Sequence, residues 1–401
     1  MECASWLELF DKENEMEFFS IMMIHCICAL TMMWSPPKAA PPPASTARIV
    51  SAANAFLDTL DAKQRQRVLY AFDDKEQRAR WSNFPTGFIP RGGISLKEMS
   101  PAQRSAAMGL MASVLSPRGL EKVQQIMEGD EVLKVDDAKN GNRPPGGGPP
   151  PGNGGPPPGN GPQRGNGGNR PPMGGRPGGE LSGDMFGKDL YYISFLGKPS
   201  ERDPWMLQFG GHHLALNITI AGERGVLTPT LTGAQPALYT SGGKTVRPLG
   251  QESDKALALL NAFDDSERKK AILSYQLADL VLGPGQDGKM IVPEGLKASA
   301  MNERQRAMLL DVISEWAGII HESAAAARMA ELKADLNETW FSWSGPTTAA
   351  PGKNITAYYR IQGPHLVIEY APQTLGGDAA LHVHTMYRDP TNDYGSGMIK
   401  Q

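Results

Sequence analysis

The sequence predicts an α+β protein in which two pseudo-repeated units each place helices before antiparallel strands. In each half of the chain, segments with apolar residues at helical spacing precede segments in which β-branched and aromatic residues alternate with others. Four short segments of the first half also recur in the second half, in the same order. Helices and antiparallel strands that are segregated along the chain are typical of the α+β class.

Composition limits the classes of function. The 401 residues include 40 basic and 43 acidic side chains, a formal net charge of −3, which argues against a nucleic-acid binder driven by bulk charge. The three cysteines are Cys3, Cys26 and Cys28, so the rest of the chain has neither a disulfide framework nor a Cys-ligated zinc site. The sequence contains no GxSxG, P-loop or HExxH motif.

Residues 1–46 are expected to be a leader followed by a Pro-rich stretch. The apolar run from Phe18 to Trp34 precedes small residues and prolines, as in a secretory signal peptide. The acidic residues before the run are atypical of such a leader, and a start at Met16 would remove them. We therefore expect an exported protein, periplasmic or extracellular, or an anchored one if the leader is retained. No later segment is apolar enough to span a membrane.

Residues 47–140 are predicted to be the helical part of the first unit. Within them, 47–78 and 100–127 carry apolar residues at helical spacing, and Ser100 or Pro101 can open a helix. Residues 141–180 hold 16 Gly and 12 Pro. Because this segment lacks the apolar side chains that a core needs, it is predicted to be a disordered surface insertion.

Residues 181–250 are predicted to be the strand part of the first unit, 251–336 the helical part of the second, and 337–401 its strand part. The hypothesis of a duplication depends on four pairs of similar segments: LYAFDDKEQRARW (69–81) with LNAFDDSERKKAI (260–272), GISLKEMSPAQR (93–104) with GLKASAMNERQR (295–306), YISFLG (192–197) with WFSWSG (340–345), and FGGHHLALN (209–217) with IQGPHLVIE (361–369).

Five of the seven histidines fall in the predicted strands: His212, His213, His365, His382 and His384. Strand alternation places His382, His384 and Met386 on one face, with Val383 and Thr385 opposite. It places His212 on an apolar face and His213 on the opposite face.

Two histidines separated by one residue on a strand face can present both imidazoles to one metal ion. We expect His382 and His384 to be ligands, with His213, and with Glu369 or His212 completing the site. A thioether contributed by Met386 would favour copper; without it, zinc and manganese are equally plausible. The alternative is a histidine-rich polar pocket without metal. Convergence of the ring nitrogens of His213, His382 and His384 within about 4–5 Å would favour the metal.

RDPTNDYG (388–395) supplies further candidates. Arg388 can bind a carboxylate or phosphate of a substrate, with Asp389 beside it, and Asp393 can hold the proton of a metal-bound histidine. The alternative is a rigid turn in which Arg388 pairs internally. Similarly, WSNFP (81–85) with Arg91 either lines a pocket or simply packs Trp81 against the helices.

Three of these segments, FGGHHLALN, TPTLTGAQPA and HVHTMYRDPTNDYG, resemble the secreted bacterial proteins grouped as domain of unknown function 3500. The resemblance spans about residues 47–396 and implies an exported protein. It implies no established activity, and no catalytic residue is carried over. Three functions remain open: a metal-dependent hydrolase or oxidase, a non-enzymatic exported module that binds a small molecule or cell-surface polymer, and a metal-free enzyme with a histidine base.

Overall fold

The computed structural model describes residues 44–139, 185–374 and 377–399, which belong to one compact unit. The predicted insertion (141–180) and nearly all of the predicted leader (1–46) lie outside these described residues. Within the described ranges, no helix has both the length and the apolarity needed to cross a bilayer.

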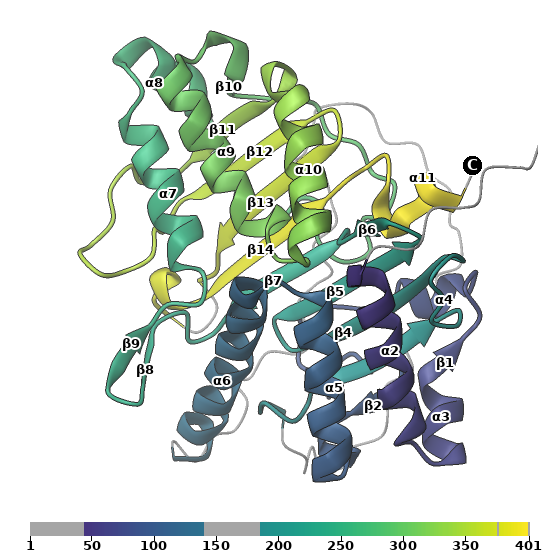
Figure 1. Ribbon diagram of the computed structural model, residues 1–401. Helices are drawn as coiled ribbons and strands as arrows, with labels where there is room; N and C mark the ends of the chain where they lie inside the picture. Colours follow the sequence, from purple (N-terminus) through teal and green to yellow (C-terminus); the bar gives the residue numbers. More distant parts are fainter. Residues whose placement is uncertain (1–43, 140–184, 375–376, 400–401) are drawn as a thin grey trace, which may run out of the picture. The chain divides into compact units, whose positions relative to one another are not determined.

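The described strands of the main sheet are β1 (Leu69–Tyr70), β2 (Ile94–Ser95), β3 (Tyr192–Leu196), β4 (Trp205–Gly211), β5 (Leu214–Ala221), β6 (Arg224–Val226), β7 (Thr230–Ala234), β10 (Leu296–Lys297), β11 (Trp340–Ser344), β12 (Tyr358–Gly363), β13 (Leu366–Pro372) and β14 (Val383–Arg388). They form one sheet in the order β1-β3-β4-β5-β7-β14-β13-β12-β11-β10, with β2 beside β3 and β6 beside β5 (Figure 1). A separate hairpin pairs β8 (Tyr239–Ser241) with β9 (Lys244–Val246).

The sheet and its helices confirm the predicted α+β class. Neighbouring strands are antiparallel, apart from the short parallel pair β1 and β3. The two predicted sets of strands, however, are not separate sheets. They form one continuous sheet because β7 pairs with β14 from the second half of the chain.

The longer helices are α2 (Ala44–Asp58), α5 (Pro101–Val114), α6 (Pro117–Lys139), α7 (Gly250–Asn261), α9 (Glu303–Ala317) and α10 (Glu322–Ala334). They lie together on one side of the sheet (Figure 1). Ser100 caps α5 and Asn302 caps α9, each through a capping box with a glutamine three residues later. The predicted helix over 47–78 is interrupted, because Asp61 caps a new short helix, α3 (Ala62–Val68).

The two faces of the sheet differ in polarity. Alternate residues such as Phe195, Leu207, Ile368 and Tyr370 belong to the buried apolar clusters that the helices cover. Their neighbours on the opposite face include polar side chains such as Gln208 and Glu369, together with small apolar clusters. That face is covered by two loops, 79–93 and 273–295, which bond to its polar side chains. The candidate metal centre lies on this loop-covered face.

Candidate metal centre

His382 and His384 project from the same face of β14, as predicted. His382 follows the short 3-10 helix η4 (Ala379–Leu381), and His384 lies inside the strand. Val383 packs in the helix-covered core, on the opposite side. The Nε2 atoms of His382 and His384 are 3.1 Å apart. Both side chains are buried.

His212 and His213 do not lie on strand faces, which corrects the prediction from alternation. Gly211 pairs with Leu214, so the two histidines form a two-residue turn between β4 and β5. His213 has a φ of 59°, in the left-handed region that few non-glycine residues adopt. The turn directs the His213 ring toward β14, and its carbonyl accepts a hydrogen bond from the backbone N–H of Gly233, on β7, at 2.7 Å.

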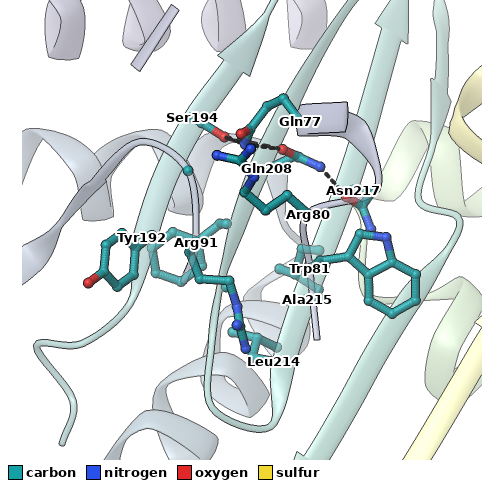
Figure 2. Close-up of a pocket in the computed structure, with 14 residues that line it drawn as sticks. Gln77, Arg80, Trp81, Arg91, Tyr192, Ser194, Gln208, Leu214, Ala215 and Asn217 are labelled. Atoms are coloured by element: carbon teal, nitrogen blue, oxygen red, sulfur yellow. Dashed lines mark hydrogen bonds between the residues drawn. The ribbon is translucent and has the colours of Figure 1, made fainter. Parts of the chain in front are cut away.

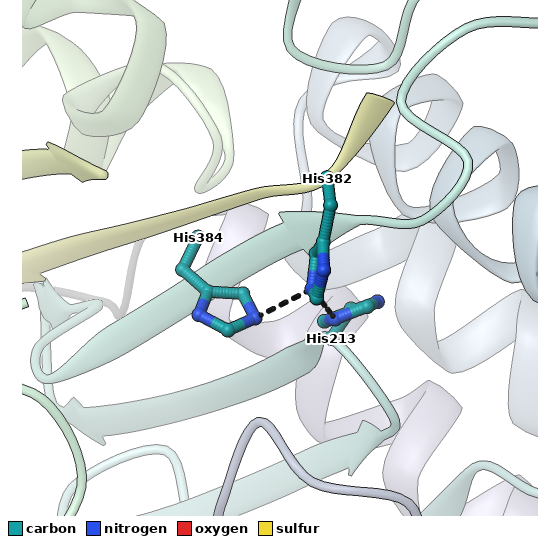
Figure 3. Close-up of side chains that lie close together, drawn as sticks. All are labelled: His213, His382 and His384. Atoms are coloured by element: carbon teal, nitrogen blue, oxygen red, sulfur yellow. Dashed lines mark hydrogen bonds between the residues drawn. The ribbon is translucent and has the colours of Figure 1, made fainter. Parts of the chain in front are cut away.

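The three rings of His213, His382 and His384 converge (Figure 3). One nitrogen from each lies within 4.8 Å of the other two, which confirms the predicted convergence. The Nε2 atoms of His213 and His382 are 3.1 Å apart. Nitrogens bound to one tetrahedral zinc ion at about 2.1 Å are about 3.4 Å apart. Small rotations of the rings would therefore bring all three to one ion.

Hydrogen bonding alone accounts poorly for this cluster. A neutral imidazole nitrogen offers one position in its ring plane, either an N–H or a lone pair. His382 Nε2 lies 3.1 Å from both His213 Nε2 and His384 Nε2. It can make one well-aligned hydrogen bond to these atoms, which leaves the second contact unmatched. A metal ion would use a lone pair from each ring.

The site favours neutral rings. Burial, together with the neighbouring His212, His382 and His384, lowers the pKa of His213 well below its ordinary value. Burial also lowers the pKa of His384, against the opposing effect of Asp279. Neutral imidazole is the form that binds a metal, so His213 and His384 are prepared for an ion at neutral pH.

Asp279 lies on the outer, Nδ1 side of His384, whereas Asn83 lies close to both nitrogens of that ring. Neither was named as a site residue from the sequence, although the WSNFP segment contains Asn83. Asn83 Nδ2 is 3.3 Å from His384 Nδ1, and Asp279 Oδ1 is 3.8 Å from the same nitrogen. Although burial acts to raise it, the pKa of Asp279 is lowered by its interaction with His384. A carboxylate facing the outer nitrogen of a histidine is typical of metal centres. No motif marks Asp279, because it lies on an irregular loop.

The loop that carries Asn83 is held in place by Arg91. The Arg91 guanidinium donates to the backbone carbonyls of Ser82 and Phe84, each at 2.7 Å, and of Gly211 at 3.0 Å. Burial lowers the pKa of Arg91 to about 10, which leaves it charged at neutral pH. Arg91 therefore links the loop to the β4–β5 turn that carries His213.

Trp81 and Arg91 also line a small cavity on the same face of the sheet (Figure 2). Its volume is about 20 Å³, room for about one water molecule. Gln77, Gln208 and Asn217 also line this cavity. The Gln77 amide donates a hydrogen bond to Gln208, and the Gln208 amide donates one to Asn217, each at 2.9 Å. Trp81 contacts the loop-covered face of the sheet, not the helices.

Comparison with known protein families matches residues 43–396 to the family described as "Protein of unknown function (DUF3500)". This chain belongs to the DUF3500 family. The match covers nearly the whole chain and agrees with the resemblance noted in its sequence. No curated protein and no solved structure matched the chain.

Glu369 of this DUF3500 protein, a predicted ligand, lies outside the group of three histidines. Its carboxylate accepts hydrogen bonds from the backbone N–H groups of Val281 and Leu282, both at 2.8 Å, and from the Tyr358 hydroxyl at 2.6 Å. Burial raises the pKa of Glu369. In this structure Glu369 attaches the loop 273–295 to β13.

Arg388 is buried among internal partners. It donates to the carboxylates of Asp287 at 2.9 Å and Asp393 at 2.8 Å. It also donates to the carbonyls of Leu282 and Gly283. Each of these four partners belongs to the protein, as the rigid-turn alternative requires.

Asp389 and Asp393 complete that turn. Asp393 Oδ1 accepts the backbone N–H of Asp389 at 3.0 Å, and its other oxygen accepts from Arg388. Asp389 Oδ1 accepts from Thr391, and its Oδ2 lies 2.9 Å from Arg328. Asp393 was predicted to hold a histidine proton, but in the DUF3500 structure Asp279 is the carboxylate nearest His384.

His365 and Met386 do not join the three histidines either. His365 occupies the β12–β13 turn at the position that His213 occupies in the β4–β5 turn. Its side chain is 48% exposed and bonds to Thr391. Met386 packs in a small apolar cluster with Trp81 and Leu231.

Proposed function

We propose that this DUF3500 protein is an exported metalloenzyme in which His213, His382 and His384 bind one transition-metal ion that activates water for hydrolysis. The observation that carries the proposal is the convergence of three buried imidazoles on one point. Three protein ligands leave a fourth position on zinc for water, as in catalytic zinc sites. Zinc bound in such a site lowers the pKa of that water toward 7.

Zinc is preferred to copper on the donor set. Imidazole suits both ions. The packing of Met386 against Trp81 and Leu231 leaves copper without the thioether that would favour it. Asp279, which is half-exposed, lies beside His384 at the edge of the site and would orient the imidazole.

Burial supports a second candidate, a non-enzymatic exported binding module. The residues His213, His382 and His384 are each at most 6% exposed. In this case the ion would fasten the β4–β5 turn to β14 without turnover. The ligand of the module would be a small molecule or a cell-surface polymer.

Reconstitution separates the two candidates. The full chain, purified without a tag and stripped by chelation, is reloaded with Zn²⁺ or Cu²⁺. We expect the zinc form to hydrolyse p-nitrophenyl acetate, and expect neither the stripped protein nor the H382A/H384A variant to do so. Ascorbate oxidation by the copper form alone would indicate oxidative chemistry. Metal binding without activity in either assay would favour the binding module.

Two further features belong to this proposal. Export is supported by the apolar run and the small residues of the leader. A duplication is supported by Gly93 and Gly295, which both have positive φ just before β2 and β10. It is also supported by capping boxes at Asp61 and Asp264, on α3 and α8 (Asp265–Ala271), which favour matching these two helices instead of the segments 69–81 and 260–272 that were paired from the sequence.

A further inference from the structure

His212 lies against the candidate metal centre without belonging to it. Its ring stacks on the ring of His213, with centroids 3.7 Å apart and planes inclined by 30°. Phe186 also packs against His212, with ring centroids 5.0 Å apart. The His212 ring therefore covers one side of the His213 ring, and Phe186 packs against His212 in turn.

Asp130, on α6, holds the His212 ring in position. Its Oδ1 lies 2.6 Å from His212 Nδ1, and its Oδ2 accepts the backbone N–H of Gly187 at 3.1 Å. In this pair the His212 Nδ1–H is the group that can donate to an ionised carboxylate, which only accepts. The carbonyl of His212 accepts the hydroxyl of Tyr191 at 2.8 Å. Both the ring and the backbone of His212 are thus held by buried partners.

His213 needs such support. Its left-handed backbone is disfavoured in an L-residue. Gly233 leaves room for its ring, because a β-carbon at Gly233 would lie 3.1 Å from His213 Cδ2. The His212 ring restrains the His213 ring from another direction. Ligands held by neighbours in this way lose little freedom when an ion binds.

We propose that Asp130 and His212 are positioning residues that hold His213 with its Nε2 toward His382 and His384. This inference rests on the proposed metal function. The pair contributes no ligand, so its loss would leave the donor set intact and change the geometry of the site. Partners of metal ligands typically change metal affinity 10–100-fold when they are replaced.

The test uses Co²⁺ as a probe in the full-length, metal-free protein. Its visible spectrum reports coordination geometry, and its titration gives the affinity. The variants are Asp130→Asn, which weakens the bond to His212, and His212→Phe, which keeps an aromatic ring without that bond. Glu131→Gln is the matched control, because Glu131 accepts the backbone N–H of the adjacent Lys188 at 3.1 Å and has no bond to His212.

We expect D130N and H212F to bind one Co²⁺ with 10–100-fold lower affinity and a shifted spectrum, and E131Q to match the wild type. Thermal unfolding of the metal-free proteins identifies a variant that fails to fold, in which case the other decides. Wild-type affinity and spectrum in the folded variants would overturn the positioning role alone. If the wild type binds no cobalt, the proposed metal function fails and the positioning role fails with it.

Discussion

The Nε2 atoms of His213 and His382 lie 3.1 Å apart, although 169 positions separate these residues in the chain. His213 belongs to the β4–β5 turn of the first half, and His382 precedes β14 of the second. Between them runs the seam of the sheet, where His384 pairs with Gly233 of β7. An ion at this point would connect the two halves of the sheet.

Zn²⁺ should therefore stabilise the metal-free protein against heat. A ligand that binds only the folded state contributes about 2.7 kcal/mol at 100 times its Kd. We expect Zn²⁺ to raise the melting temperature of the wild type and of the H365A control. His365 lies in the β12–β13 turn, outside the group of three histidines. The H213A variant should show no rise. An equal rise in H213A would mean that zinc binds elsewhere.

Gly233→Ala should disturb the site without removing a ligand. The new β-carbon would lie 2.9 Å from the Val383 carbonyl oxygen and 3.1 Å from His213 Cδ2, closer than a normal contact. We expect a loss of about 1–3 kcal/mol of stability, by overpacking, and weaker Zn²⁺ binding. Gly109→Ala is the control, since nothing lies within 4 Å of its β-carbon. Urea unfolding and zinc titration measure both effects, and wild-type behaviour of G233A would contradict the described packing.

Glu369→Gln distinguishes a structural carboxylate from a metal ligand. Because Glu369 accepts two backbone N–H groups and a hydroxyl, we expect the substitution to cost about 1.5–3 kcal/mol of stability. Zinc content should stay at the wild-type level. A folded variant that loses its zinc would restore Glu369 to the ligand set that the sequence suggested.

Asp393 should make the stability of the folded protein depend on pH. Burial raises its pKa to about 6, against the lowering effect of Arg388, while an unfolded aspartate has a pKa of about 3.9. The folded state therefore binds more protons between about pH 4 and 6, and stability falls as pH rises through this range. The free energy of unfolding lost over this range is up to about 3 kcal/mol.

Urea unfolding of the wild type and of Asp393→Asn, across pH 4 to 7, measures this contribution. The difference in free energy of unfolding between the two proteins should change across that range and be constant above it. A difference that does not vary with pH would show that the Asp393 pKa is not raised.

Strand alternation was enough to predict that His382 and His384 share a face, whereas their convergence with His213 was a hypothesis that needed the fold to test it. It misplaced His212 and His213 because the turn they form lacks the usual signal. Two-residue turns with a left-handed residue normally contain Gly or Asn, whereas here His213 adopts that conformation. The pairing of Gly211 with Leu214 decides the turn, and that pairing depends on the whole register of β4 with β5.

The neighbours of the three histidines could not be predicted in the same way. Asn83 and Asp279 lie on loops without periodicity, and long-range bonds set their positions. Arg91 binds the carbonyl of Gly211, and Glu369 binds the backbone of Val281. Asp130 lies on a helix whose spacing indicates its apolar face but not the histidine that it meets.

The metal content of protein purified without a tag tests the central claim most directly. The wild type, the H382A/H384A variant and the H365A control would each be loaded with zinc once, and the excess removed. Elemental analysis would then give the zinc content of each protein. We expect one zinc ion per chain in the wild type and in H365A, and almost none in H382A/H384A. Equal zinc in all three proteins would contradict a metal centre at His213, His382 and His384.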